Sequence, residues 1–215
     1  MPFKGVSVVT TTWNERENLT KLIPEIRNVL KQFPHEIIIV DDDSPDGTIQ
    51  VARLLADVAV SKKRESQSKG LLYGMKLAKY SIIVTMDADL ENSPTHIPKL
   101  IKQISNFDVV VASRLNLPRI SEKIASKLLG KVLGVTDVFS NFRAFRNEVV
   151  SKVKLRGGET FGAEFLVIAR KERLAIGEIK YASSIRRKSP RIGGKIQANL
   201  RILWALIKSL IVYAT

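Results

Sequence analysis

Two aspartates separated by one residue follow an apolar segment in the middle of the chain. Asp87-Ala88-Asp89 comes directly after Ile82 to Met86, so both carboxylates are expected at the end of a buried strand. Hard divalent cations such as Mg²⁺ take oxygen ligands and bridge carboxylates to phosphates. The pattern predicts a metal site for a phosphorylated substrate, although a solvated turn with an Asx-type hydrogen bond would have the same sequence.

A second acidic cluster leaves another apolar segment in the same way. Asp41-Asp42-Asp43 follows Ile37 to Val40, and Ser44-Pro45-Asp46-Gly47 comes next. Like charges that gather at one sheet edge require compensation, either by a metal or by the hydrogen-bond donors of a bound ribose or base. The Pro-Asp-Gly sequence also predicts a turn, with Thr48 at the start of a helix. The two interpretations are compatible.

The elements that would position these clusters alternate between strand and helix, which predicts βαβ units and a mostly parallel sheet. The expected strands cover residues 6–11, 36–41, 58–60, 81–86 and 108–112, and the expected helices cover residues 18–32, 47–55, 70–79 and 95–103. Ligands bind beyond the carboxyl ends of the strands in such sheets. We therefore expect residues 13–15, 41–43 and 87–89 to meet at one edge.

The second half of the chain carries nearly all of the net charge of +14. Its pattern predicts a basic helix near residues 121–133, a strand at 141–146, a helix after Thr160, a strand near 177–183 and a long C-terminal helix. A basic half predicts an anionic partner, which could be a phospholipid surface, a phosphorylated substrate or a nucleic acid.

Helical spacing favours the phospholipid surface. Lys123, Lys127 and Lys131 lie four residues apart, with Ile124, Leu128 and Val132 beside them, and residues 197–215 pair Arg201 and Lys208 with aliphatic residues. Such basic amphipathic helices are typical of membrane interfaces, although both could pack on the core or on a partner. No uncharged run approaches the ~18 residues of a membrane span, and the N-terminus lacks a signal-peptide pattern. With no cysteines, the sequence favours a peripheral protein on the cytoplasmic face of a membrane.

Three linked segments carry a resemblance to a known family. Residues 14–19 (Asn-Glu-Arg-Glu-Asn-Leu), 41–48 (Asp-Asp-Asp-Ser-Pro-Asp-Gly-Thr) and 86–90 (Met-Asp-Ala-Asp-Leu) resemble the dolichyl-phosphate mannose synthases, which are inverting family 2 glycosyltransferases within the polyprenyl-phosphate glycosyltransferase group. Later segments continue in register, so the resemblance covers nearly the whole chain. It implies a GT-A fold in which residues 1–165 form the catalytic domain. Residues 166–215 would add an acceptor loop and a membrane-surface helix to the same structural unit.

The resemblance also implies roles for individual residues. The nucleotide sugar would be held by Thr11, Trp13, Glu15, Val40, Asp42, Asp87, Ala88, Asp89, Arg114, Arg186 and Arg191. The metal, Mg²⁺ or Mn²⁺, would bind Asp87, Asp89 and Glu91, and the catalytic residues would be Asp89, Arg114 and Arg186.

The implied reaction is transfer of mannose from GDP-mannose to dolichyl or another polyprenyl phosphate, with inversion. A phosphomonoester is already an anion, so catalysis would require charge stabilisation by the metal and by arginines. The lack of a membrane span is compatible with a separate small membrane-anchoring subunit. The alternatives are a sibling transferase that uses UDP-glucose or another sugar nucleotide, a nucleotidyltransferase, and a basic nucleic-acid-binding protein. The last lacks a recognisable binding motif, and we expect no nucleic acid as a partner.

The chain departs from the family pattern near the sugar and the acceptor. Thr11, Trp13 and Asp43 stand where Pro, Tyr and Gly are usual, and Ser66-Gln67-Ser68 replaces a Gly-rich loop. Residues 139–141 (Phe-Ser-Asn) stand where Thr-Gly-Ser is usual, and Ile185 replaces an Asp. These departures affect the prediction of mannose more than the prediction of glycosyl transfer.

Overall fold

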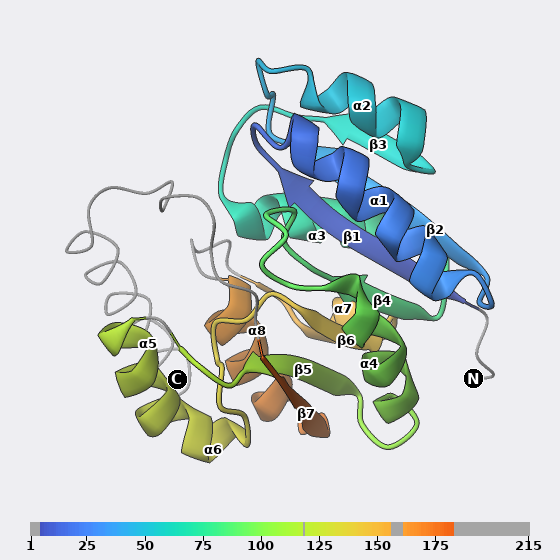
Figure 1. Cartoon of the computed structure of the whole chain (residues 1–215). Helices are drawn as coiled ribbons and strands as arrows, with labels where there is room; N and C mark the ends of the chain where they lie inside the picture. The colour runs from blue at the N-terminus through green and yellow to red at the C-terminus, as the bar shows by residue number, and fades with distance from the viewer. Residues whose placement is uncertain (1–4, 118, 156–160, 183–215) are drawn as a thin grey trace.

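The computed structural model describes residues 5–117, 119–155 and 161–182 (Figure 1). The strands are β1 (Val6–Thr12), β2 (His35–Asp41), β3 (Val58–Ser61), β4 (Ile82–Thr85), β5 (Val109–Arg114), β6 (Arg143–Arg146) and β7 (Ile176–Tyr181). The α-helices are α1 (Arg16–Leu30), α2 (Thr48–Leu55), α3 (Gln67–Leu77), α4 (Ile97–Gln103), α5 (Ile120–Ala125), α6 (Lys131–Leu133), α7 (Val149–Lys152) and α8 (Phe161–Lys171). A 3₁₀ turn (Pro94–His96) precedes α4, and a π-helical turn (Ser126–Gly130) joins α5 to α6.

The strands form one sheet in the order β3-β2-β1-β4-β6-β5-β7. Every neighbouring pair is parallel except those of β6, which runs antiparallel to both β4 and β5. All the other strands therefore end at the same edge of the sheet, and the chain enters β6 from that edge. The expected mostly parallel sheet is confirmed.

Helices cover both faces of the sheet, because alternate residues of each strand point to opposite sides. Val8 and Val110 pack with α1, α2 and α4 on one face. Val9 and Val109 pack with α3, α5, α6, α7 and α8 on the other. Figure 1 shows α5 and α6 at the side of the molecule away from α1 and α2. The result is a three-layer α/β structure whose polar strand ends remain at one edge.

Two glycines let α3 approach the sheet closely. A Cβ atom at Gly74 would lie 2.5 Å from Val9 Cγ1, and one at Gly70 would lie 2.8 Å from Thr11 Cγ2, so a side chain at either position would force the helix away. This packing brings the N-terminus of α3, which begins at Gln67, over the ends of β1 and β4.

Most element bounds agree with the sequence-based expectations within three residues. Helix α3 begins at Gln67 instead of Gly70, because the Ser66 side chain accepts a hydrogen bond from the Lys69 backbone N–H and starts the helix earlier. The expected helix at 121–133 is present, but the π-helical turn interrupts it. The expected C-terminal helix lies outside the described residues. Within the described residues, no helix is long and apolar enough to cross a membrane.

Candidate active site

The loops after β1 and β2 are tied together by the first aspartate of the second cluster. Asp41 Oδ1 accepts hydrogen bonds from Thr12 Oγ1 at 2.8 Å and from Ser44 Oγ at 2.7 Å, and Asp41 Oδ2 accepts one from the Ser44 backbone N–H at 2.8 Å. Ser44 Oγ in turn accepts from the Asn14 backbone N–H at 2.9 Å. Asp41 is therefore a structural residue that fixes both loops, and it was not among the predicted site residues.

Each of the three acidic turns contains a non-glycine residue in the left-handed backbone region. The φ angles are +57° at Asn14 after β1, +61° at Asp43 after β2 and +63° at Leu90 after β4. Asparagine and aspartate tolerate this region, whereas leucine rarely adopts it. Strained backbone of this kind clusters at functional sites, because the surrounding structure must hold it.

The residues predicted to hold the nucleotide lie side by side at the ends of β1 and β2. Thr11 pairs in register with Val40, and Asp42 is buried beyond the end of β2. Lys62 Nζ lies 2.7 Å from Asp42 Oδ1. The guanidinium carbon of Arg64 lies 3.6 Å from the centre of the Trp13 ring. Lys62 and Arg64 were not among the predicted site residues, since their contacts join segments that are distant in sequence.

Glu15, the other residue predicted on the β1 side, is buried. Its carboxylate accepts a hydrogen bond from Asn18 Nδ2, and its backbone N–H donates to Thr48 Oγ1 at 2.9 Å. Glu15 thus joins the start of α1 to the start of α2 and lies beside the predicted nucleotide site.

Asp87 is held at the end of β4 by two amide side chains. Its Oδ1 accepts from Gln67 Nε2 at 2.7 Å and from Asn141 Nδ2 at 3.3 Å. Burial and the nearby charge of Asp89 raise the pKa of the Asp87 carboxyl to about 6, although the two amides act in the opposite direction. The excess of negative charge at this position is what a bound cation would relieve.

The other two predicted metal ligands, Asp89 and Glu91, lie in the turn after β4. The Glu91 backbone N–H donates to Asp89 Oδ1 at 3.1 Å, which closes the turn through Leu90. In the part of the chain that the structure describes, no three His, Cys, Asp or Glu side chains form a group that could hold a metal ion. Mg²⁺ commonly binds one or two carboxylates together with substrate phosphates. Asp87 and Asp89 therefore fit a cation that is shared with a phosphorylated substrate.

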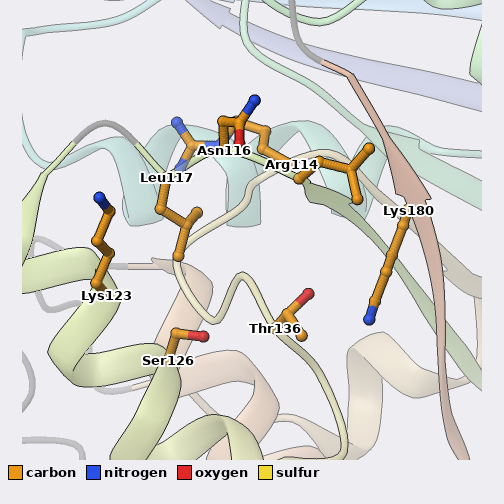
Figure 2. Close-up of a pocket in the computed structure, with 8 residues that line it drawn as sticks. Arg114, Asn116, Leu117, Lys123, Ser126, Thr136 and Lys180 are labelled. Atoms are coloured by element: carbon orange, nitrogen blue, oxygen red, sulfur yellow. The ribbon is translucent and has the colours of Figure 1, made fainter.

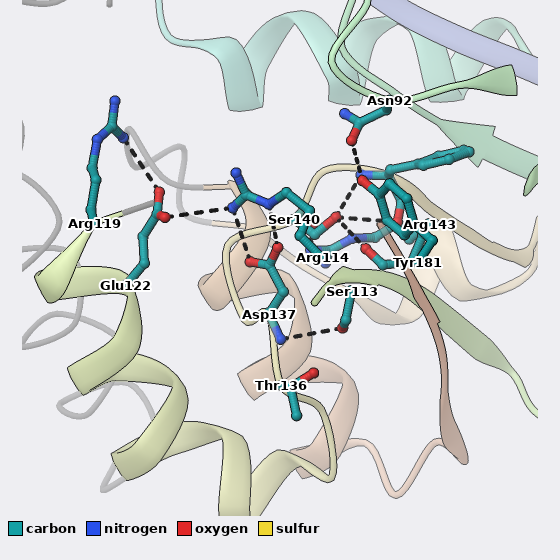
Figure 3. A network of polar contacts seen from close by, with 12 residues as sticks. Asn92, Ser113, Arg114, Arg119, Glu122, Thr136, Asp137, Ser140, Arg143 and Tyr181 are labelled. Carbon is teal, nitrogen blue, oxygen red and sulfur yellow. Dashed lines mark hydrogen bonds and ion pairs between the residues drawn. The ribbon is translucent and has the colours of Figure 1, made fainter. Parts of the chain in front are cut away.

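Arg114, at the end of β5, faces a carboxylate pair (Figure 3). Its Nε donates to Asp137 Oδ2 at 2.6 Å, its Nη2 donates to Asp137 Oδ1 at 3.3 Å, and Glu122 Oε2 lies 3.8 Å from Nη2. Hydrogen bonding and the charge of Asp137 raise the pKa of Arg114, although burial opposes them, so the guanidinium stays charged. Glu122 also pairs with Arg119 at 3.4 Å.

A polar pocket of about 320 Å³ lies beside Arg114 (Figure 2). It is lined by Arg114, Leu115, Asn116, Leu117, Lys123, Ser126, Thr136 and Lys180. Among the described residues, three cationic side chains line it, which suits an anion such as a phosphate. Two of them already have carboxylate partners outside the lining, because Arg114 pairs with Asp137 at 2.6 Å and Lys180 Nζ lies 3.8 Å from Glu178 Oε2. Arg186 and Arg191, which were predicted to contact the donor, lie outside the described residues.

The sequence profile of glycosyl transferase family 2 matches residues 7–152, which include all three acidic strand ends and Arg114. The chain belongs to glycosyl transferase family 2. A dolichol-phosphate mannosyltransferase of Pyrococcus furiosus is 35% identical over 94% of the chain and 64% of the relative. An undecaprenyl-phosphate 4-deoxy-4-formamido-L-arabinose transferase of Aeromonas hydrophila is 30% identical over 68% of the chain and 50% of the relative. The chain thus spans between half and two thirds of the length of these relatives.

Solved structures agree with the family assignment at the level of the fold. Glucosyl-3-phosphoglycerate synthase from Mycobacterium tuberculosis superposes with a TM-score of 0.79 at 21% identity, over 96% of this chain and 80% of that chain. Mannosyl-3-phosphoglycerate synthase from Rubrobacter xylanophilus superposes with a TM-score of 0.77 at 17% identity, over 96% and 72%. The GT-A fold expected for this family 2 glycosyltransferase is confirmed.

Proposed function

We propose that this family 2 glycosyltransferase transfers a sugar from a nucleotide-sugar donor to a polyprenyl phosphate at a membrane surface, with a divalent cation as cofactor. The observation that carries the proposal is the arrangement at one sheet edge. Asp42 and Asp87 lie at the ends of strands on one side of β6, and the cationic pocket beside Arg114 lies on the other side. A site that binds one anion through a metal and a second anion through cations suits transfer between two phosphorylated substrates.

The donor would lie across the ends of β1, β2 and β4. Trp13, whose ring also contacts the Arg64 guanidinium, would offer a ring for stacking the base. Asp42, whose Oδ1 pairs with Lys62, would accept hydrogen bonds from the base or ribose through Oδ2. Asp87 and Asp89 would hold the cation, which would stabilise the diphosphate. The similarity to the dolichol-phosphate mannosyltransferase of Pyrococcus furiosus favours mannose as the transferred sugar, which makes GDP-mannose the first donor to test. The arabinose-derivative transferase, at 30% identity, supports a sibling activity with another sugar nucleotide as the second candidate. Structures of the mycobacterial synthase hold Mn²⁺ with UDP-glucose, which supports a divalent cation.

The acceptor phosphate would occupy the pocket beside Arg114. A phosphomonoester attacks the anomeric carbon of the donor without a general base, and in-line attack inverts that centre. The cation, when bound, stabilises the charge that develops on the leaving diphosphate. Arg114 already bonds Asp137 through Nε and Nη2, so it would reach the phosphate with its Nη1 or by exchanging part of that pair. Lys123 adds positive charge on the wall of the pocket, and Lys180 also lines it, with its Nζ 3.8 Å from Glu178 Oε2.

The helical segment that runs from α5 to α6 would contact the membrane surface. Ile120, Ile124, Leu128 and Val132 form a stripe at four-residue spacing, with exposed fractions of 73%, 42%, 55% and 41%. Lys123, Lys127 and Lys131 are exposed beside that stripe, whereas Ala125, Leu129 and Leu133 face the core. An exposed apolar stripe flanked by lysines is typical of helices that bind anionic lipid. Because Lys123 also lines the pocket, a lipid phosphate would enter from this side.

The proposal is tested by product formation with a panel of labelled sugar nucleotides, polyprenyl phosphate and Mn²⁺ or Mg²⁺. We expect label in the organic phase with one donor and release of nucleoside diphosphate, which separates transfer from a nucleotidyltransferase that releases pyrophosphate. Asp89→Ala should lower turnover by at least about a hundredfold, because it removes a cation ligand that acts on the leaving group. Extractable label from no donor, together with binding of generic RNA or DNA, would favour the nucleic-acid-binding alternative.

A further inference from the structure

Two amide side chains from distant parts of the chain converge on one oxygen atom of Asp87. Gln67 begins α3, and Asn141 lies in the loop that enters β6. Besides their bonds to Asp87 Oδ1, at 2.7 Å and 3.3 Å, the two amides bond each other, with Asn141 Nδ2 donating to Gln67 Oε1 at 3.1 Å. The three side chains therefore form a closed triangle.

The backbone around Asn141 is fixed independently of Asp87. Thr85 Oγ1 donates to the Asn141 carbonyl oxygen at 2.6 Å. Arg143, which is fully buried, donates from Nη2 to the Ser140 carbonyl oxygen and from Nη1 to the Gly162 carbonyl oxygen at 3.1 Å. The Asn141 amide is thus carried by a segment whose position is set by β4, β6 and the start of α8.

The two carboxylate oxygens of Asp87 have different environments. A carboxylate only accepts hydrogen bonds, and both amide N–H groups reach Oδ1. Two donors from different directions restrict rotation of the carboxylate, so Oδ2 keeps one orientation and remains for a ligand from outside the triangle.

We propose that Gln67 and Asn141 are positioning residues that hold Asp87 so that its Oδ2 faces the divalent cation and the donor diphosphate. The inference rests on the proposed function, since it assigns a role within that same site. Hydrogen-bonding partners behind metal ligands typically change metal affinity by about 10- to 100-fold when they are removed.

The test is direct binding of Mn²⁺ in the presence of GDP or UDP, measured from the electron paramagnetic resonance signal of free Mn²⁺. Gln67→Met and Asn141→Ala should each weaken Mn²⁺ binding about tenfold or more. The matched control is Gln103→Met at the end of α4, which lies near the opposite edge of the sheet because α4 leads to the start of β5. It should bind Mn²⁺ like the wild type. Melting temperatures without metal report whether the variants remain folded.

Turnover adds a second readout that a purely structural role would not change. In both amide variants the Mn²⁺ concentration for half-maximal turnover should rise, and turnover should recover at saturating Mn²⁺. If the wild type binds Mn²⁺ with a nucleoside diphosphate and both folded variants bind it within twofold as tightly, the positioning role is wrong while the proposed function stands. If the wild type itself binds no Mn²⁺ with either nucleotide, the proposed function fails and this inference falls with it.

Discussion

The Nε atom of Arg114 donates a hydrogen bond to Asp137 Oδ2 at 2.6 Å, and the side chain of Asp137 is 1% exposed. This pair joins the end of β5 to the loop before β6. An arginine predicted to bind phosphate is thereby held in place by a buried carboxylate before any substrate arrives.

Loss of this pair should be costly for stability. Asp137→Ala leaves the largely buried Arg114 without its main partner, and breaking a buried pair from one side typically costs about 3 kcal/mol or more. We expect a loss of about 3 kcal/mol in the free energy of unfolding, measured by denaturant titration. Glu65→Gln, which removes an exposed partner of Lys69 at 2.7 Å, is the control and should lower the free energy of unfolding far less than Asp137→Ala does. Equal losses in both variants would contradict the structural role of Asp137.

The left-handed backbone at Asp43 predicts a different response to two substitutions. Asp43 has a φ of +61° and an exposed side chain. Asp43→Val should destabilise the protein by about 1 to 2 kcal/mol, because a β-branched residue is strained there. Asp43→Gly should stay within about 0.5 kcal/mol of the wild type, since glycine adopts this conformation freely. Thermal unfolding checks both, with Lys63→Val as a control for an exposed valine; similar stability of both Asp43 variants would contradict the prediction.

The raised pKa of Asp87 predicts a pH-dependent stability in the presence of a chelator. Because its pKa lies at about 6 instead of 3.8, the folded protein holds this proton more tightly than the unfolded chain does. The free energy of unfolding should therefore fall as pH rises from about 4 to about 6, and the contribution of Asp87 is about 2 to 3 kcal/mol.

Burial also raises the pKa of Glu122, so the titration of Glu122 changes the free energy of unfolding in the same direction. A comparison of the wild type with Asp87→Asn therefore isolates the contribution of Asp87. The difference in unfolding free energy between the wild type and Asp87→Asn should change across the interval from pH 4 to pH 6. A constant difference would show that Asp87 titrates with its ordinary pKa.

Membrane binding should depend on the exposed stripe of α5 and α6. Leu128→Glu places a charge in the middle of that stripe, so affinity for vesicles that contain anionic lipid should fall at least about tenfold, measured by co-sedimentation. Leu54 on α2 is 83% exposed but lies outside the stripe, so Leu54→Glu should bind like the wild type. Equal effects of the two substitutions would point to net charge instead of a specific surface.

The parts of the site that sequence alone predicted are those encoded locally. The acidic residues at 41–43 and 87–89 each follow their own apolar strand, and the parallel order of β1, β2 and β4 then brings them to one edge. Domain limits, the acceptor loop with Arg186 and Arg191, and the C-terminal helix remain predictions, because residues 183–215 lie outside the described part of the chain.

Each contact that the sequence did not predict joins two segments that are distant in sequence. Asn141 reaches Asp87 only because β6 inserts antiparallel beside β4, and an antiparallel strand between parallel ones has no local signal in residues 141–146. Lys62 reaches Asp42 because β3 pairs with β2. Arg114 was predicted from its place after a strand, but its partner Asp137 depends on how the chain returns towards β6.

The position and reversed direction of β6 have a consequence for how the two sides of the site respond to substitution. One strand separates the side of the sheet that carries the acidic ends from the side that carries the cationic pocket, and it pairs with both β4 and β5. Directly before that strand, Asn141 Nδ2 donates to Asp87 Oδ1 on one side, and Ser140 Oγ donates to the Ala112 carbonyl oxygen on the other. A substitution in residues 140–141 would therefore disturb the acidic side and the cationic side together.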